Sequence, residues 1–207
     1  MKASAFAYTR ATSVANALEL LAAHGDRAKV LSGGQSLMPA MNLRLISPEL
    51  IVDIGDLADL RGVAVKGDIL TIGALTRHVD LQRSPEIAAH APLLRDAIGH
   101  VGHPAIRNRG TIGGSLAHAD PASELPACMV ALGATIVARG PGGERRIAAE
   151  EFFTGIYETA LSPQELLVGD RTARPRGSTP RISSRSSPGD MAIMPLSAWR
   201  RRRHCNA

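Results

Sequence analysis

The sequence predicts an α+β protein made of two subdomains, which divide near residues 53–58. Three observations support this fold class. Two stretches, 13–26 and 78–102, carry apolar residues at helical spacing. Short runs rich in β-branched residues lie between them, separated by glycine and aspartate. A further pair of such runs meets at the turn 140–143, and we therefore expect the strands to pair mainly in antiparallel fashion.

The first subdomain is expected to begin with an amphipathic helix. Residues 13–26 read SVANALELLAAHGD, in which the valine and leucines recur at helical spacing. Thr12 or Ser13 can cap the N-terminus of this helix, and Gly25 can end it. The following residues, AKVLSGG, predict a short buried strand that runs into a glycine loop.

The second subdomain combines short strands with a group of helices. Short strands joined by tight turns are predicted by LIVDIGD at 50–56, next to the division between the subdomains, and by GVAVKGD and ILTIGALT within 62–76. Residues 78–102 return to helical spacing, and Pro85 and Pro92 break this segment into shorter helices. Residues 133–153 predict a hairpin with its turn at Gly-Pro-Gly-Gly.

Composition indicates a globular protein and argues against nucleic acid as a partner. Of the 207 residues, 44% are hydrophobic, which is enough to bury a sizeable core. The net charge is +5, but arginines crowd the C-terminal part, and the rest of the chain is near neutral. Aromatic residues make up only 3%, so the stacking platforms of single-strand binders are absent.

Membrane segments and metal sites are not expected. No apolar run approaches the roughly 20 residues of a membrane helix, and the N-terminus lacks the apolar stretch of a signal peptide. A cytoplasmic location is therefore expected. Cys128 and Cys205 are too few and too far apart for a disulfide framework or a sulfur-rich metal site.

The character of the sequence changes after Val168. The following residues are rich in arginine, serine, proline and glycine, and they show no apolar periodicity. Such a composition predicts a disordered tail. The expected division is a first subdomain at 1–55, a second at 56–168 and a tail at 169–207.

Two glycine loops carry the chemical signal. Residues 32–36, Ser-Gly-Gly-Gln-Ser, can form a nest of backbone N–H groups that cradles a pyrophosphate. The loop lacks the lysine of a P-loop and the glycine spacing of a Rossmann turn. Considered by itself, this loop could also be a plain tight turn without a ligand. Residues 110–115, Gly-Thr-Ile-Gly-Gly-Ser, repeat the pattern. Two such nests suit one long, anionic and flat ligand.

A family resemblance rests on four segments in order. These are SGGQSLMPAMNLRL at 32–45, TIGALTRH at 71–78, IRNRGTIGGSLAHADPASELP at 106–126 and GIYETALSPQELLV at 155–168. Together they resemble the FAD-binding medium subunit of molybdenum hydroxylases. The nearest likeness is to the aerobic carbon monoxide dehydrogenase medium subunit, with the xanthine dehydrogenase FAD-binding subunit as a more distant relative. The resemblance covers residues 1 to about 168.

The resemblance implies a set of cofactor contacts and no catalytic residue. Around the FAD diphosphate and its adjoining ribose it places Leu31, Ser32, Gly33, Gly34, Gln35, Ser36 and Leu37. Along the other side of the cofactor, toward the flavin, it places Thr111, Ile112, Gly113, Gly114 and Ser115. It gives an acidic cofactor contact to Glu124, and an apolar position beside the isoalloxazine to Val168.

The resemblance also implies a fold and partners. The fold would be the two-subdomain FAD-binding type of the vanillyl-alcohol oxidase group, also called the PCMH type. The partners would be a small subunit with [2Fe-2S] clusters and a large subunit with the molybdenum cofactor, in a dimer of heterotrimers. Electrons would pass from the clusters through FAD to an external acceptor, and the cofactor would supply the redox chemistry.

The family pattern implies a further C-terminal domain that is missing from this sequence. That domain opens with a Tyr-x-Lys segment, where this chain has Ile182 and Ser183. Back-translation of residues 181–199, read two nucleotides later, permits YLKSFVARRHGDYAAVGVA, which is the family segment. We therefore expect a one- or two-base change between about Gly169 and Arg181, and an out-of-frame tail in place of the C-terminal flavoprotein domain.

Two pairs of residues keep alternative interpretations. His100 and His103 could share a metal, but no third ligand is near in the sequence, and a turn-forming or buried pair is the simpler interpretation. Arg107 and Arg109 could neutralise phosphate or form surface salt bridges.

Asp120 and Glu124 could suggest acid–base chemistry, but a loop so rich in small residues fits cofactor packing better.

Three functions stay open at this point. The first hypothesis is the electron-transfer flavoprotein subunit. The second is an inactive truncated remnant without redox function, and the third is a free-standing FAD oxidoreductase.

Overall fold

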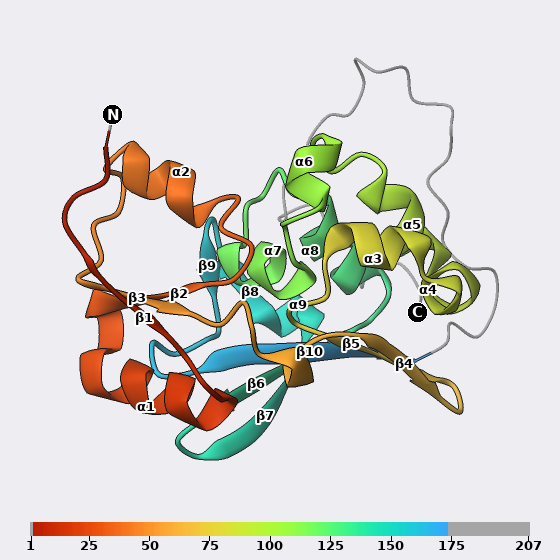
Figure 1. Ribbon diagram of the computed structural model, residues 1–207. Coiled ribbons are helices and arrows are strands. Elements are labelled where there is room, and N and C mark those ends of the chain that lie inside the picture. The colour runs from red at the N-terminus through yellow and green to blue at the C-terminus, as the bar shows by residue number, and fades with distance from the viewer. Residues whose placement is uncertain (1, 174–207) are drawn as a thin grey trace.

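The computed structural model describes residues 2–173, which form two main sheets and a small two-stranded ribbon (Figure 1). Within this range no helix has both the length and the apolarity needed to cross a membrane. The mixed helix and sheet class predicted from the sequence is confirmed.

The first sheet contains three parallel strands in the order β1-β3-β2. Their bounds are β1 Ala7–Arg10, β2 Ala28–Leu31 and β3 Leu50–Asp53. The expectation of antiparallel pairing is wrong for this sheet. Helices connect its strands in sequence, and such crossovers allow neighbouring strands to run in the same direction.

Helix α1, Val14–His24, packs on this sheet and begins and ends where the sequence predicts. The Ser13 hydroxyl accepts a hydrogen bond from the Asn16 N–H at 3.0 Å, and Gly25 ends the helix with a φ of 53°. Helix α2, Leu37–Asn42, follows the first glycine loop. Short 3-10 turns occupy Gly25–Arg27 and Ala58–Leu60.

The second sheet contains five antiparallel strands in the order β4-β5-β10-β6-β7. The bounds are β4 Val63–Lys66, β5 Ile69–Gly73, β6 Thr135–Gly140, β7 Gly143–Ala148 and β10 Leu166–Ala173. Strands β6 and β7 form the predicted hairpin. The ribbon pairs β8, Phe153–Gly155, with β9, Glu158–Thr159.

Helices α3 to α8 gather on one side of the five-stranded sheet (Figure 1). Pro85 and Pro92 each stand at the first position of a helix, as the break in periodicity predicts. The bounds are α3 His78–Arg83, α4 Pro85–His90, α5 Pro92–Ile98, α6 Pro104–Arg107, α7 Ile112–His118, α8 Glu124–Ala131 and α9 Ala149–Phe152.

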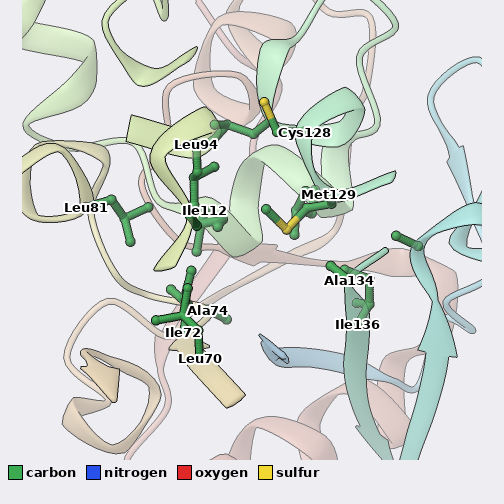
Figure 2. Packing of buried hydrophobic residues seen from close by; sticks show 14 of the residues in the cluster. Leu70, Ile72, Ala74, Leu81, Leu94, Ile112, Cys128, Met129, Ala134 and Ile136 are labelled. Atoms are coloured by element: carbon green, nitrogen blue, oxygen red, sulfur yellow. The ribbon is translucent and has the colours of Figure 1, made fainter. Parts of the chain in front are cut away.

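Two apolar cores stabilise the fold. The larger lies between the five-stranded sheet and its helices, and fully buried Ile72, Ile112 and Ile136 belong to it (Figure 2). The smaller lies between the three-stranded sheet and α1. Leu75 and Leu166 join this smaller core although they come from the second part of the chain. The two parts of the chain therefore share buried apolar contacts.

The predicted start of the tail at residue 169 is wrong. Gly169 to Ala173 continue strand β10, which pairs with β5 on one side and β6 on the other. Strand pairing at the centre of a sheet overrides the polar composition of this segment. The rest of the predicted tail, 174–207, lies outside the described residues. The division at residue 55 stays a prediction.

Strand β10 carries an unusual buried carboxyl group. The Asp170 side chain is fully buried and stands beside Ile72 and Ile136 on the neighbouring strands. Neither carboxyl oxygen has a hydrogen-bond partner within residues 2–173, and the hydroxyl of buried Thr172 has none there either. Burial raises the pKa of Asp170 from 3.8 to about 8. The carboxyl is therefore mostly protonated in the folded protein at neutral pH.

Replacing Asp170 by valine should raise the free energy of unfolding and flatten its dependence on pH. Between about pH 4 and pH 8 the folded protein keeps a proton that the unfolded chain has released, so stability falls as pH rises. The expected slope from this group is about 1.4 kcal/mol per pH unit. Urea unfolding at pH 5 and pH 8 measures it.

Thr172→Val is the matched control, because it removes an unpartnered hydroxyl without removing a titrating group. This variant should keep the wild-type slope. Equal slopes in wild type and Asp170→Val would contradict the assignment of a buried neutral carboxyl.

Candidate functional site

A cavity of about 430 Å³ opens where loops from the two parts of the chain meet. One wall comes from the ends of β2 and β3, and the other comes from residues that follow β5 and precede α7. The volume is typical of sites for small molecules and cofactors. The cavity is therefore the candidate binding site.

The first glycine loop forms one wall of the cavity and depends on the small size of its glycines. A Cβ added to Gly33 would lie 2.3 Å from the carbonyl oxygen of Arg109 and 2.8 Å from Cα of Gly110. Gly34 has a φ of 70°, a conformation that favours glycine. The Gln35 side-chain amide donates a hydrogen bond to the Gly33 carbonyl at 3.0 Å. The first loop therefore packs closely against the backbone of the second loop.

Thr111 joins the second glycine loop to the first. Its Oγ1 lies 2.6 Å from Ser32 Oγ, so the two hydroxyls hydrogen-bond across the cavity edge. Thr111 also caps α7, because its Oγ1 accepts a hydrogen bond from the Gly114 N–H at 3.2 Å. We name this arrangement the Ser32–Thr111 clasp. It holds the two loops at one cavity.

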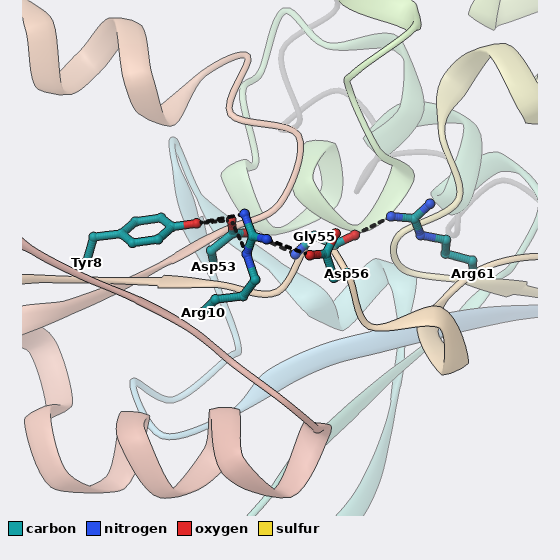
Figure 3. Close-up of polar contacts among 6 residues, drawn as sticks. All are labelled: Tyr8, Arg10, Asp53, Gly55, Asp56 and Arg61. Atoms are coloured by element: carbon teal, nitrogen blue, oxygen red, sulfur yellow. Dashed lines mark hydrogen bonds and ion pairs between the residues drawn. The ribbon is translucent and has the colours of Figure 1, made fainter.

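A polar cluster closes the end of the cavity near β3 (Figure 3). Asp53 accepts hydrogen bonds from the Tyr8 hydroxyl at 2.5 Å and from the Gly55 N–H at 2.8 Å. Arg10 forms an ion pair with Asp56 at 2.8 Å and lies 3.6 Å from Asp53. Arg10 therefore shares its single positive charge between the two acidic residues that line this end of the cavity.

The sequence predicted part of the cavity wall. Six of the predicted cofactor contacts line the cavity, namely Leu31, Ser32, Gly33, Gly34, Gln35 and Thr111. They come from both glycine loops. The structure therefore brings the two loops together, and the cofactor role of each residue stays a prediction.

The other predicted contacts do not line this cavity. Ile112 and Gly113 are buried, and a Cβ on Gly113 would lie 2.6 Å from the Ala74 Cβ. Ser115 hydrogen-bonds to Ser123 at 3.0 Å, near the start of α8. Outside the cavity lining stand Ser36, Leu37, Ile112, Gly113, Gly114, Ser115, Glu124 and Val168.

Several residues of the wall were not predicted from the sequence. They include Met38, Asp53, Gly55, Asp56, Arg61, Leu75 and Arg77. A signal was available for part of this set. Asp53 ends β3, which pairs in parallel with β2, and the carboxyl ends of parallel strands meet at one edge of a sheet. The positions of Arg61 and Arg77 have no local signal, because they depend on contacts between segments distant in the sequence, such as the bridge between Arg77 and Thr111.

Some alternative candidates have structural roles. Arg107 donates hydrogen bonds at 2.9 Å to the carbonyls of Val101 and Gly102, so it stabilises a loop. Asp120 accepts a hydrogen bond at 2.9 Å from the Ala122 N–H, which is a turn contact. Burial raises the pKa of the Cys128 thiol to about 12, so this thiol stays protonated at neutral pH.

His78 is buried beside the cavity wall but does not face the ligand space. It follows Arg77 at the start of α3 and lies against Gly110. Burial lowers the pKa of His78, so it is neutral at pH 7. Among residues 2–173, no group of three or more histidine, cysteine, aspartate or glutamate side chains could hold a metal ion.

Comparison with protein families identifies the family of this chain. Residues 4–169 match the family of the FAD binding domain in molybdopterin dehydrogenase. The chain therefore belongs to this family. The resemblance and the FAD cofactor predicted from the sequence are confirmed at this level.

Individual relatives support the assignment over the same region. The chain is 46% identical over 168 residues to the 6-hydroxypseudooxynicotine dehydrogenase complex subunit alpha of Paenarthrobacter nicotinovorans, covering 81% of this chain and 57% of that protein. It is 43% identical to the carbon monoxide dehydrogenase medium chain of Hydrogenophaga pseudoflava, covering 79% of this chain and 57% of that one. The chain thus spans less than two thirds of these relatives.

Solved structures share the fold. Carbon monoxide dehydrogenase from Hydrogenophaga pseudoflava superposes with a TM-score of 0.83 at 41% identity, covering 85% of this chain and 61% of that one. Quinoline 2-oxidoreductase from Pseudomonas putida 86 superposes with a TM-score of 0.82 at 38% identity, covering 84% of this chain and 61% of that one.

Replacing Gly33 or Gly114 by valine should each abolish flavin retention. The added side chain at Gly33 collides with backbone of the second loop, and at Gly114 a Cβ already lies 2.9 Å from Thr111 Oγ1. Flavin absorbance per protein in the purified variants measures the effect. Gly142→Ala is the matched control, because a Cβ there meets nothing within 4 Å. Wild-type flavin occupancy in Gly33→Val, with an unchanged unfolding midpoint, would contradict the loop assignment.

The Ser32–Thr111 clasp should show energetic coupling. Ser32→Ala and Thr111→Val each remove one hydroxyl of the hydrogen bond, and the second also removes the cap of α7. A double-mutant cycle on the free energy of unfolding isolates the hydroxyl pair, with an expected coupling of about 0.5–1.5 kcal/mol. Additive single effects would mean that the clasp does not form in solution.

Proposed function

We propose that this chain is the FAD-binding part of an electron-transfer flavoprotein subunit of a molybdenum hydroxylase. In this role it takes electrons from [2Fe-2S] clusters of a partner subunit and passes them through FAD to an external acceptor. The observation that carries the proposal is the Ser32–Thr111 clasp, which joins two glycine loops at one cavity. Membership of the FAD-binding family supports it.

The residues of the cavity fit a flavin dinucleotide. The first loop offers backbone N–H groups at Gly33, where a Cβ would strike the second loop, and at Gly34, whose positive φ favours glycine. Ser32 and Gln35 add polar side chains to the same wall. These groups would hold the FAD diphosphate and adjoining ribose, while Thr111 and the second loop would lie on the other side of the cofactor. Bound FAD supplies the redox chemistry, because flavins exchange electrons one or two at a time.

The site residues outside the cavity lining remain part of the proposal. Glu124 stands at the first position of α8 and is partly buried, and it would contact the cofactor through its carboxylate. Val168 is partly buried at an irregularity of β10 and would pack beside the isoalloxazine. Neither residue would take part in substrate chemistry.

The proposed partners carry the other cofactors. Substrate oxidation would occur at a molybdenum-cofactor subunit, and a small [2Fe-2S] subunit would relay the electrons, in a dimer of heterotrimers located in the cytoplasm. Relatives of this chain are named for dehydrogenases of carbon monoxide and of caffeine at 43% and 42% identity. Similar chains thus belong to dehydrogenases named for different substrates, which supports the proposal that another subunit determines the substrate.

The direct test is a titration of the purified chain with FAD, followed by addition of a reduced [2Fe-2S] partner subunit. We expect one FAD per chain and loss of flavin absorbance when the reduced partner is added. Failure to bind FAD at any concentration would favour the inactive remnant. Binding of FAD with substrate turnover in the absence of partners would favour a free-standing oxidoreductase.

A further inference from the structure

The charges around the cavity are unevenly neutralised. Its two acidic residues, Asp53 and Asp56, both form ion pairs with Arg10. Arg61 on the same wall donates a hydrogen bond to the carbonyl of Gly55. These contacts satisfy the charged side chains at the β3 end of the cavity, so this end presents little net charge.

The two arginines on the other wall of the cavity form no such ion pair. Arg77 and Arg109 line the cavity and are exposed to solvent. Across residues 2–173, neither guanidinium lies within 4.0 Å of a carboxylate or forms a side-chain hydrogen bond. Two arginines of the cavity lining therefore carry positive charges that no carboxylate of the described chain pairs with.

Backbone contacts hold both arginines next to the glycine loops. Arg77 pairs with Thr111 through a single antiparallel bridge, and the following N–H, of His78, donates to the Gly110 carbonyl at 3.0 Å. The Arg109 carbonyl is the atom that a Cβ on Gly33 would strike. A phosphate bound by the first loop would therefore lie beside these two residues.

We propose that Arg77 and Arg109 form a cationic clamp for the pyrophosphate of the ligand. The clamp makes the site select a flavin dinucleotide over riboflavin, which carries no phosphate. A guanidinium offers several N–H donors in a fixed plane and binds phosphate oxygens with two hydrogen bonds. The inference rests on the proposed function for the identity of the ligand, and adds the residues that discriminate among flavins.

The test compares three ligands: FAD, riboflavin and inorganic pyrophosphate. Arg77→Gln and Arg109→Gln should each weaken FAD binding about tenfold or more, because each removes charge-assisted hydrogen bonds. Riboflavin affinity should stay within about twofold of wild type. The loss of FAD affinity on raising salt should be smaller in each variant, since one ionic contact is gone.

Two further variants separate charge from structure. Arg95→Gln removes an exposed arginine of α5 that lies outside the cavity lining, so it should bind FAD as wild type does. Arg109→Lys retains the charge and should recover part of the lost affinity. Unfolding midpoints measured for all variants check that the fold is intact.

The outcomes distinguish this inference from the proposed function. Wild-type FAD affinity in both glutamine variants would overturn the clamp and leave FAD binding standing. An equal loss of riboflavin affinity would also overturn it, since that result indicates a structural role. If the wild-type chain binds pyrophosphate through these arginines but binds no FAD, the clamp stands and the proposed function fails. Absence of binding to both FAD and pyrophosphate overturns both.

Discussion

The candidate site depends on the contact between two glycine loops that are far apart in the sequence. Gly33 allows the first loop to meet the backbone at Arg109, and the Ser32–Thr111 clasp adds a hydroxyl–hydroxyl bond of 2.6 Å at the same place. A side chain inserted at Gly33 would separate the loops, because backbone atoms cannot move aside as the end of a flexible side chain can. The cavity and its donors therefore exist only while this contact holds.

Strand β10 contributes to both apolar cores of the fold. Leu166 packs into the smaller core and Leu167 into the larger, so one strand contributes to both. Its next residues bring a buried carboxyl group into the larger core without a partner in the described chain. The strand that joins the two cores therefore also carries the Asp170 carboxyl, which is costly to ionise in the core. The stability of the folded site thus depends on the protonation of Asp170.

Local chemistry explains which features the sequence predicted. The cap and stop of α1, the prolines that begin α4 and α5 and the turn between β6 and β7 each depend on neighbouring residues, and these predictions are confirmed. The two glycine loops could also be predicted, because adjacent glycines are recognisable in a sequence without knowledge of the fold. Family membership then followed from the order of the motifs.

Long-range contacts explain what the sequence did not predict. Strand β1 is short, and it is defined by pairing with β3, which lies more than 40 residues later. The last residues of β10 look like a polar tail until β5 and β6 flank them. Arg77 joins the cavity wall because its backbone bridges to Thr111. The most direct test of the account is hydrogen exchange of the backbone amides with and without FAD. FAD is expected to protect amides in residues 33–36 and 109–111 together, because both segments contribute to the cavity lining, whereas protection of neither loop, or of only one, would contradict the shared site.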